Sequence, residues 1–203
     1  MTKICTEKEI DTICKDLKQG KVVGFPTETV YGLAILADSK KAFDELVQLK
    51  KRPINKPMTV MVAKKEKIHD YALVNQKQQK IIDTFMPGPL TIILKAKEHL
   101  PHTMTLGQKS IGFRIPNHEL SLEILKCINK PLLVTSANIS SSPAFIQAKD
   151  VYHAFKGQLS SLIDADSLGK NASTVIDLTQ DRPLLLRKGE ISFEDILKVW
   201  ESE

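Results

Sequence analysis

KVVGFPTETVYGLAILA, residues 21–37, contains two apolar runs separated by a short polar segment. The runs at 21–25 and 30–37 are typical of buried strands. Pro26 cannot donate a backbone hydrogen bond, so the strand must bend or lie at a sheet edge there. Two threonine hydroxyls, a carboxylate and a phenol follow within residues 27–31. They predict either a strand-to-strand turn or a polar cluster at a sheet end that suits a small polar substrate.

Outward from this stretch, apolar runs and helical periodicities alternate along the chain. Helices are predicted, with capping signals at Thr6 and Ser192, over about 6–19, 39–52, 64–85 with a break near 74–75, 117–129, 147–156 and 192–200. Further strands are predicted at 58–63, 90–96, 110–116, 131–138, 159–163, 173–178 and 183–187. Some neighbouring strands are too close in sequence for a helical crossover. The sequence therefore predicts an α/β fold with an open, twisted, mixed parallel and antiparallel sheet covered by helices.

The 203 residues contain 42% apolar and 26% charged side chains, an ordinary globular composition that argues against whole-chain disorder. No repeat or long linker is visible, so we expect one domain over 1–203 without a C-terminal extension domain. Twenty-nine basic against 24 acidic residues give a net charge of +5, which permits phosphate contact but identifies no partner. The first residues do not form a signal peptide, and no apolar run approaches the roughly 20 residues of a membrane span. We therefore expect a cytoplasmic protein without a membrane segment.

The three cysteines are an odd number and form no C-x-x-C motif. This argues against a disulfide framework and against a cysteine-ligated zinc site. Cys14 and Cys127 fall at apolar positions of predicted helices, and we expect both to be small core residues.

Residues 50–57, KKRPINKP, place four cations within seven positions. At a helix C-terminus these cations would interact favourably with the helix dipole, which is the structural alternative. Two prolines stiffen the segment, however, and a rigid cationic loop suits a polyphosphate.

Residues 110–116, SIGFRIP, alternate like a strand and place Ser110, Gly112 and Arg114 on one face. A buried arginine needs a partner, so Arg114 predicts a structural salt bridge or a site for a carboxylate or phosphate.

Residues 135–143, TSANISSSP, follow a buried strand with a dense set of small polar groups. They predict either a flexible loop or a site for ribose or phosphate oxygens at a strand end. Ser173, Thr174 and Arg187 could belong to the same site.

Several catalytic signatures are absent. The sequence contains no phosphate-binding loop, dinucleotide fingerprint, H-E-x-x-H motif or G-x-S-x-G nucleophile elbow. His99 and His102 are expected to be solvated loop residues, and no metal site is predicted.

FPTETVYGL (25–33), KKRP (50–53), the strand with Arg114, TSANIS (135–140), ASTVID (172–177) and LLLRKGE (184–190) together resemble the YrdC-like family of threonylcarbamoyl-AMP synthases. The resemblance extends over about residues 8–200. It implies the YrdC-like fold and an L-threonylcarbamoyladenylate synthase, a nucleotidyltransferase. Such an enzyme joins L-threonine, bicarbonate and ATP into threonylcarbamoyl-AMP and pyrophosphate. A separate transferase complex then moves the threonylcarbamoyl group to the tRNA adenosine next to the anticodon.

The resemblance also implies roles for individual residues. L-threonine would contact Thr29, Arg114, Ser173 and the backbone at Val134. ATP would contact Lys50, Arg52, Lys56, Ser110, Ser136, Asn138 and Arg187. Lys50 and Arg52 would act electrostatically, with no covalent nucleophile. Mg²⁺ would accompany ATP, and no tightly bound cofactor is expected.

Three departures from the family pattern stand out. Met61 occupies a position where many relatives have a histidine in the threonine pocket, and Lys56 one where many have asparagine. Longer relatives continue beyond residue 200, so this chain resembles the short, single-domain form. The main alternative is a non-catalytic module of the same fold that binds double-stranded RNA or tRNA. The others are a carbamoyl-transfer domain of the hydrogenase-maturation type and a paralogue that has lost threonine use.

Overall fold

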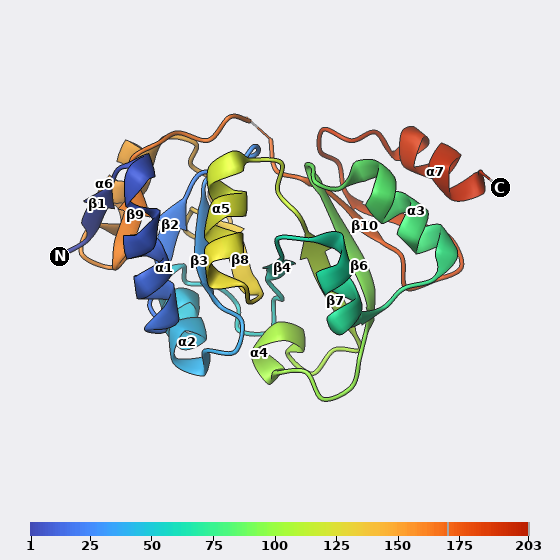
Figure 1. Ribbon diagram of the computed structural model, residues 1–203, viewed down its shortest axis with the longest axis horizontal. Coiled ribbons are helices and arrows are strands. Elements are labelled where there is room, and N and C mark those ends of the chain that lie inside the picture. Colours follow the sequence, from blue (N-terminus) through green and yellow to red (C-terminus); the bar gives the residue numbers. More distant parts are fainter. Residues whose placement is uncertain (170, 203) are drawn as a thin grey trace.

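The computed structural model describes residues 1–169 and 171–202. Its strands form one long twisted sheet that runs along the molecule, with the N- and C-termini at opposite ends (Figure 1). The strand order is β1-β9-β2-β3-β8-β4-β7-β6-β10-β11, and β5 pairs with β6 beside this path. The strands are β1 (Lys3–Cys5), β2 (Val23–Phe25), β3 (Gly32–Leu36), β4 (Thr59–Met61), β5 (Ala72–Leu73), β6 (Leu90–Ala96), β7 (Ser110–Arg114), β8 (Leu132–Ser136), β9 (Ser161–Ile163), β10 (Thr174–Asp177) and β11 (Leu184–Arg187).

The sheet is mixed, as predicted. β2, β3, β8 and β4 are successive antiparallel neighbours, whereas β4–β7, β6–β10 and β1–β9–β2 are parallel. The pairing of Phe25 with Gly32 makes β2 and β3 a hairpin. The polar segment at 26–31 is therefore the connection of this hairpin and lies at one end of the sheet.

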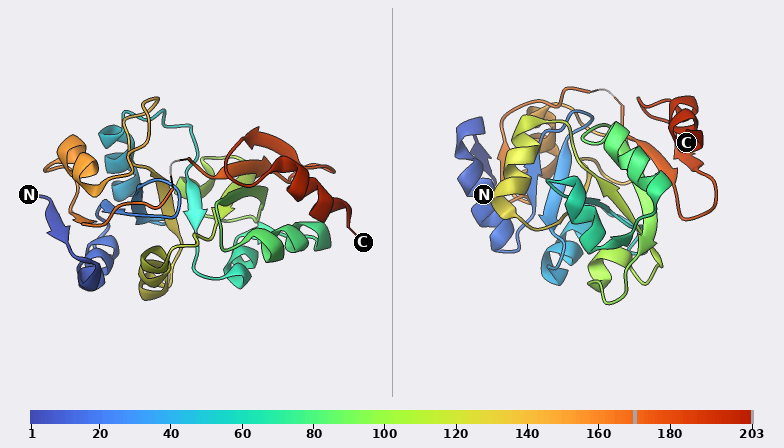
Figure 2. Two further views of the ribbon diagram at one scale, coloured as in Figure 1. Left: turned by 90° about the horizontal axis from the view of Figure 1, so that it is seen from above. Right: turned by 45° about the vertical axis from the view of Figure 1, so that its right-hand side comes forward.

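Helices flank the sheet on both sides (Figure 2). The α-helices are α1 (Ile10–Lys18), α2 (Lys40–Leu49), α3 (Gln76–Phe85), α4 (His102–Thr105), α5 (Glu119–Ile128), α6 (Ala148–Phe155) and α7 (Phe193–Glu201). Two 3-10 helices are η1 (Glu7–Glu9) and η2 (Lys65–Asp70). None of the described helices is long and apolar enough to cross a membrane.

Strand alternation divides the core between the two faces of the sheet. Met61, Leu132 and Val134 pack with residues of α1 and α5 on one face. Their sequence neighbours Val60 and Leu133 pack on the opposite face, in a larger cluster that includes α2, α3, α6 and α7. Met61 pairs in register with Arg114 of β7. The face of the sheet that α5 covers therefore continues onto β7, the strand that carries Arg114. The cavity described below opens on that continuation.

The structure differs from the sequence predictions mostly in short elements. β1, β5 and α4 were not predicted, because two to four residues carry too little periodic pattern. The predicted helix over 64–85 is η2, then β5, then α3, which begins after an Asn75 capping box. Residues 30–31 belong to the hairpin connection rather than to a strand.

The prediction for the cysteines is wrong in two respects. Cys127 is exposed, although Cys14 is buried as expected. The two form a disulfide between α5 and α1, with their Cα atoms 6.5 Å apart. They are separated by 113 residues, so no local spacing indicates the pairing.

Candidate functional site

A cavity of about 460 Å³ opens beside the hairpin connection. Its lining comes from segments far apart in the sequence: the hairpin connection, the loop before β4, and strands β4, β6, β7, β8, β10 and β11. Nine of the predicted site residues line it: Thr29, Arg52, Lys56, Ser110, Arg114, Val134, Ser136, Ser173 and Arg187. Lys50 and Asn138 do not.

The hairpin connection is held by its own threonine hydroxyls. Thr27 Oγ1 donates to Val30 O at 2.8 Å and accepts from the Thr29 backbone N–H at 3.1 Å. Thr27 and Thr29 are both buried, and their hydroxyl oxygens lie 2.9 Å apart. These bonds replace the ladder that ends at Pro26 and fix the Thr29 hydroxyl against the cavity wall.

Arg114 is the most tightly held cation of the cavity. Its side chain is 7% exposed. Nη2 donates to Thr29 Oγ1 at 2.8 Å and lies 2.8 Å from Glu28 Oε2 as an ion pair. Glu28 is fixed in turn by the Asn117 backbone N–H, which donates to its Oε1 at 2.8 Å. Arg114 Nε is buried and has no hydrogen-bond partner among the described residues.

A second guanidinium approaches from β11. Arg187 Nε donates to Ser173 O at 2.9 Å, and its Nη2 donates to Ser173 Oγ at 3.0 Å. Ser173 Oγ also lies 2.8 Å from Thr91 Oγ1 on β6. Partial burial, and then the nearby charge of Arg114, lower the pKa of Arg187. Two cations are therefore held close together, which favours an anion between them.

The third guanidinium lies in the loop after α2. Arg52 Nη2 donates to Pro57 O at 2.6 Å, and its Nε donates to Lys56 O at 3.2 Å. These two bonds join the beginning of the proline-containing loop to its end and so stabilise the loop. Burial lowers the pKa of Arg52, but an arginine stays charged near neutrality.

Lys50 lies behind the cavity rather than in its wall. The side chain is fully buried, and Nζ lies within hydrogen-bonding distance of Ser136 O, of Asn138 O at 2.7 Å and of Asn138 Oδ1 at 2.8 Å. Ser136 Oγ donates to the same Asn138 Oδ1 at 2.7 Å. Burial, then Arg52 and Lys56, lower the pKa of Lys50 to about 7. Lys50 and Asn138 thus hold the turn after β8.

The charged side chains that line the cavity are all basic, and Glu28 pairs with Arg114 from outside the lining. Three arginines and Lys56 line it, and no Asp or Glu is among the described residues of its wall. Such a wall suits a polyanion together with a smaller carboxylate. No group of three or more metal-ligating side chains occurs in the described part of the chain.

Three contributors were missed at the sequence level. Glu28 was noticed as a carboxylate in a polar cluster, but nothing in the sequence pairs it with Arg114. Thr91 looks like an ordinary strand threonine, and its contact with Ser173 depends on the parallel pairing of β6 with β10. Gln108, in the turn before β7, also lines the cavity, and no sequence motif marks it as a site residue.

The sequence and the structure both match those of known proteins. The Sua5/YciO/YrdC family model, described as telomere recombination, matches residues 15–189. A threonylcarbamoyl-AMP synthase of Pyrococcus abyssi is 36% identical over 185 residues, which are 90% of this chain and 54% of the relative. One of Bacillus subtilis is 34% identical over 183 residues, 89% of this chain and 53% of the relative.

Among solved structures, the crystal structure of P. abyssi Sua5 complexed with L-threonine superposes with a TM-score of 0.92 at 33% identity. The match covers 98% of this chain and 60% of that one. The chain spans about half the length of the first two relatives. The matched family model, the shared fold and the residues gathered at the cavity lead to one conclusion: the chain belongs to the Sua5/YciO/YrdC family.

Proposed function

We propose that the chain is an L-threonylcarbamoyladenylate synthase, a nucleotidyltransferase that converts L-threonine, bicarbonate and ATP into threonylcarbamoyl-AMP and pyrophosphate. The observation that carries the proposal is the convergence of Arg52, Arg114 and Arg187 on one cavity without an acidic residue in its described wall. The relatives named above carry this activity in their names, and one was crystallised with L-threonine.

L-threonine would lie at the Arg114 end of the cavity. Its carboxylate would accept from the part of the Arg114 guanidinium that lines the cavity, while Glu28 and Thr29 hold the guanidinium in place. Ser173 and the Val134 backbone would contact the rest of the amino acid. Met61 lies next to Arg114 in register, and it would pack against the substrate where many relatives have a histidine.

ATP would occupy the remainder of the cavity, entering as its magnesium complex. Arg52, Lys56 and Arg187 would bind the phosphates, and Ser110 and Ser136 would bind other oxygens of the nucleotide. Lys50 and Asn138 would be positioning residues, because they hold the Ser136 turn from behind.

The reaction needs no protein nucleophile. The threonine amine captures CO₂, formed by loss of hydroxide from bicarbonate, as a carbamate and releases a proton. A carbamate oxygen attacks the α-phosphorus, the bond to the β-phosphate oxygen breaks, and pyrophosphate leaves. The protein would contribute proximity and fixed positive charge, which supply much of the catalysis of phosphoryl and nucleotidyl transfer. Arg52 is then the residue that would offset charge on the leaving phosphates.

Pyrophosphate release tests the proposal directly. Purified chain should release pyrophosphate only when ATP, L-threonine and bicarbonate are all present. Arg114→Ala should abolish threonine-dependent release, whereas Arg182→Ala, which alters an exposed arginine outside the cavity, should leave it unchanged. Release that continues without threonine or bicarbonate would exclude this reaction.

The product would pass to a separate transferase that acts on tRNA. The alternative, a non-catalytic module that binds double-stranded RNA or tRNA, predicts no pyrophosphate release and an RNA affinity that falls steeply with salt. Aromatic residues make up 5% of the chain, so few stacking platforms are available for such a role.

A further inference from the structure

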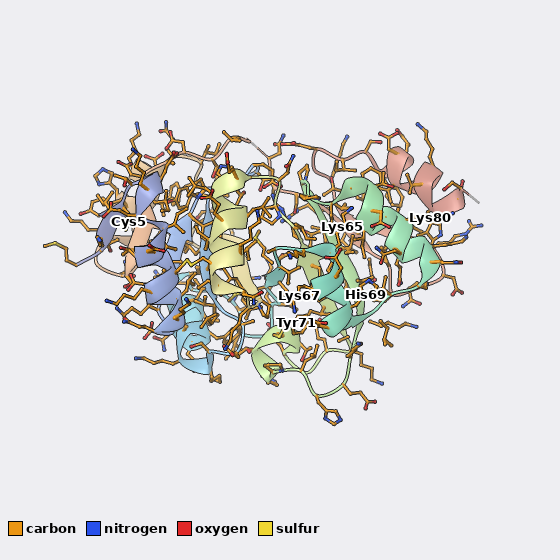
Figure 3. All side chains as sticks on the ribbon, viewed as in Figure 1. Cys5, Lys65, Lys67, His69, Tyr71 and Lys80 are labelled. Atoms are coloured by element: carbon orange, nitrogen blue, oxygen red, sulfur yellow. A yellow bond between two sulfur atoms is a disulfide. The ribbon has the colours of Figure 1, made fainter. Side chains whose placement is uncertain are left out.

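A second cavity, of about 420 Å³, lies between η2 and α5 and is separate from the first. The two cavities share no lining residue: Met58, Thr59 and Met61 line the first, whereas Val62 and Ala63, directly after β4, line the second. The rest of the second wall comes from η2 and its flanks, the C-terminal turn of α5, and the segment between α5 and β8. Figure 3 shows Lys67 and Tyr71 in the space between the two helices.

The floor of this cavity is apolar and partly aromatic. Val62, Ala63, Leu125 and Pro131 contribute aliphatic surface, and Tyr71 contributes its ring. Tyr71 packs on the core at a ring-centroid distance of 6.5 Å from Phe113, so its orientation is set by the core. A fixed aromatic ring beside aliphatic walls suits a planar group.

The rim carries four lysines: Lys64, Lys67, Lys126 and Lys130. Lys67 lies 3.0 Å from Asp70, and Lys130 lies 3.3 Å from Asp38. Lys64 and Lys126 form no ion pair within the described residues. No Asp or Glu is among the described lining residues, so the mouth has an excess of positive charge.

Two neutral polar groups complete the wall. The Asn129 side-chain amide offers a donor and an acceptor, and the Tyr71 hydroxyl offers one of each. Asn129 follows α5 in the left-handed conformation, with φ of 51°. This combination matches a flat heterocycle with polar edges that is attached to an anionic group.

We propose that the cavity between η2 and α5 binds a nucleoside phosphate, with the base against Tyr71 and the apolar floor and the phosphate on Lys64 and Lys126. The lining is confined to residues 62–71 and 125–131, which form a compact pocket rather than a groove for an extended peptide. The ligand could be a free nucleotide or one nucleotide of an RNA strand, since both present the same base and phosphate.

Binding is tested by titrating the full chain with AMP while recording backbone amide chemical shifts. Signals of Ala63, Lys67 and Asn129 should move in a saturable manner. Those of Gly32 and Gly112 report separately on the first cavity, so failure of the proposed activity is distinguishable from failure here.

Lys64→Gln combined with Lys126→Gln should weaken AMP binding at the second cavity about five- to tenfold, the combined effect expected of two exposed charge contacts. The matched control, Lys8→Gln with Lys149→Gln, removes two exposed lysines elsewhere and should leave the affinity unchanged.

Three further ligands complete the test. Inorganic phosphate should bind more weakly than AMP, because it cannot use the floor. A short RNA oligonucleotide that moves the same signals, with an affinity that falls as salt rises, would assign the source to RNA; AMP binding alone would assign it to free nucleotide. The proposal is overturned if neither AMP nor the oligonucleotide moves these signals, if phosphate binds as tightly as AMP, or if the two double variants behave alike. It is likewise overturned if a polyglutamate peptide binds there and AMP does not.

Discussion

Arg114 combines burial with an incomplete set of hydrogen bonds. Glu28 and Thr29 engage Nη2, and Nε has no partner. The planar guanidinium is needed for this arrangement, because a lysine ammonium is a point charge that cannot hold Thr29 and present a fixed second donor together.

Arg114→Lys should therefore weaken L-threonine binding even though the charge is kept. Hydrogen bonds to charged groups contribute about 1.5–3 kcal/mol, so we expect a loss of roughly ten- to a hundredfold in affinity, measured by titration calorimetry. Arg182→Lys is the matched control on the surface. Unchanged threonine affinity in Arg114→Lys would contradict the carboxylate contact.

Lys50 provides a prediction about pH. Burial with Arg52 and Lys56 lowers its pKa to about 7, so at pH 8 only about one tenth of the molecules carry the ammonium form. The phosphates of bound ATP would raise this pKa, because negative charge nearby favours the charged form. ATP binding at pH 8 should therefore take up close to one proton, whereas at pH 5.5 Lys50 is already protonated and uptake from it should vanish.

Proton uptake is measured by calorimetry in two buffers that differ in ionisation enthalpy. Lys50→Met should remove the uptake at pH 8, and Lys51→Met, on the exposed neighbour, should keep it. Equal uptake at both pH values would show that another group is responsible.

At the scale of elements, the segment after β11 depends on Gly189. A Cβ atom there would lie 2.3 Å from Thr174 N and 2.6 Å from Ala172 O, both backbone atoms that cannot move aside cheaply. Gly189→Ala should push this segment away from β10 and displace Arg187 from Ser173.

We expect Gly189→Ala to weaken ATP binding at least tenfold and to lower the thermal midpoint, since overpacking costs about 1–3 kcal/mol. Lys188→Ala, at the exposed adjacent position, should change neither. ATP affinity and thermal unfolding of both variants check this. Wild-type ATP affinity in Gly189→Ala would show that the contact of β11 with β10 does not shape the site.

The elements that the sequence predicted well are those with a strong local pattern. α5 and α7 match their predicted ranges to within two residues because amphipathic periodicity defines both and the Ser192 cap fixes the start of α7. η2 and β5 were merged into one helix, because Lys65–Asp70 repeats its apolar positions too few times to separate a 3-10 turn from an α-helix. The disulfide between α1 and α5 depends on the packing of the two helices, so no local sequence pattern predicts it.

At the scale of the whole molecule, the sheet order explains why the site could be predicted only in part. β8 and β10 are separated in the sheet by β4, β7 and β6, and the twist of these strands brings both to one cavity. The motif residues were visible in the sequence because polar groups interrupt apolar runs. Which of them face the cavity depends on tertiary packing, and the sequence alone does not show that Lys50 is buried behind the turn at Ser136.

The central claim is that one cavity holds an amino acid and a nucleotide together. The most direct measurement is the crystal structure of this chain with L-threonine and a non-hydrolysable ATP analogue. The account predicts the threonine carboxylate on Arg114 and the triphosphate between Arg52, Lys56 and Arg187. Threonine and nucleotide bound on separate surfaces, or a carboxylate that avoids Arg114, would contradict it.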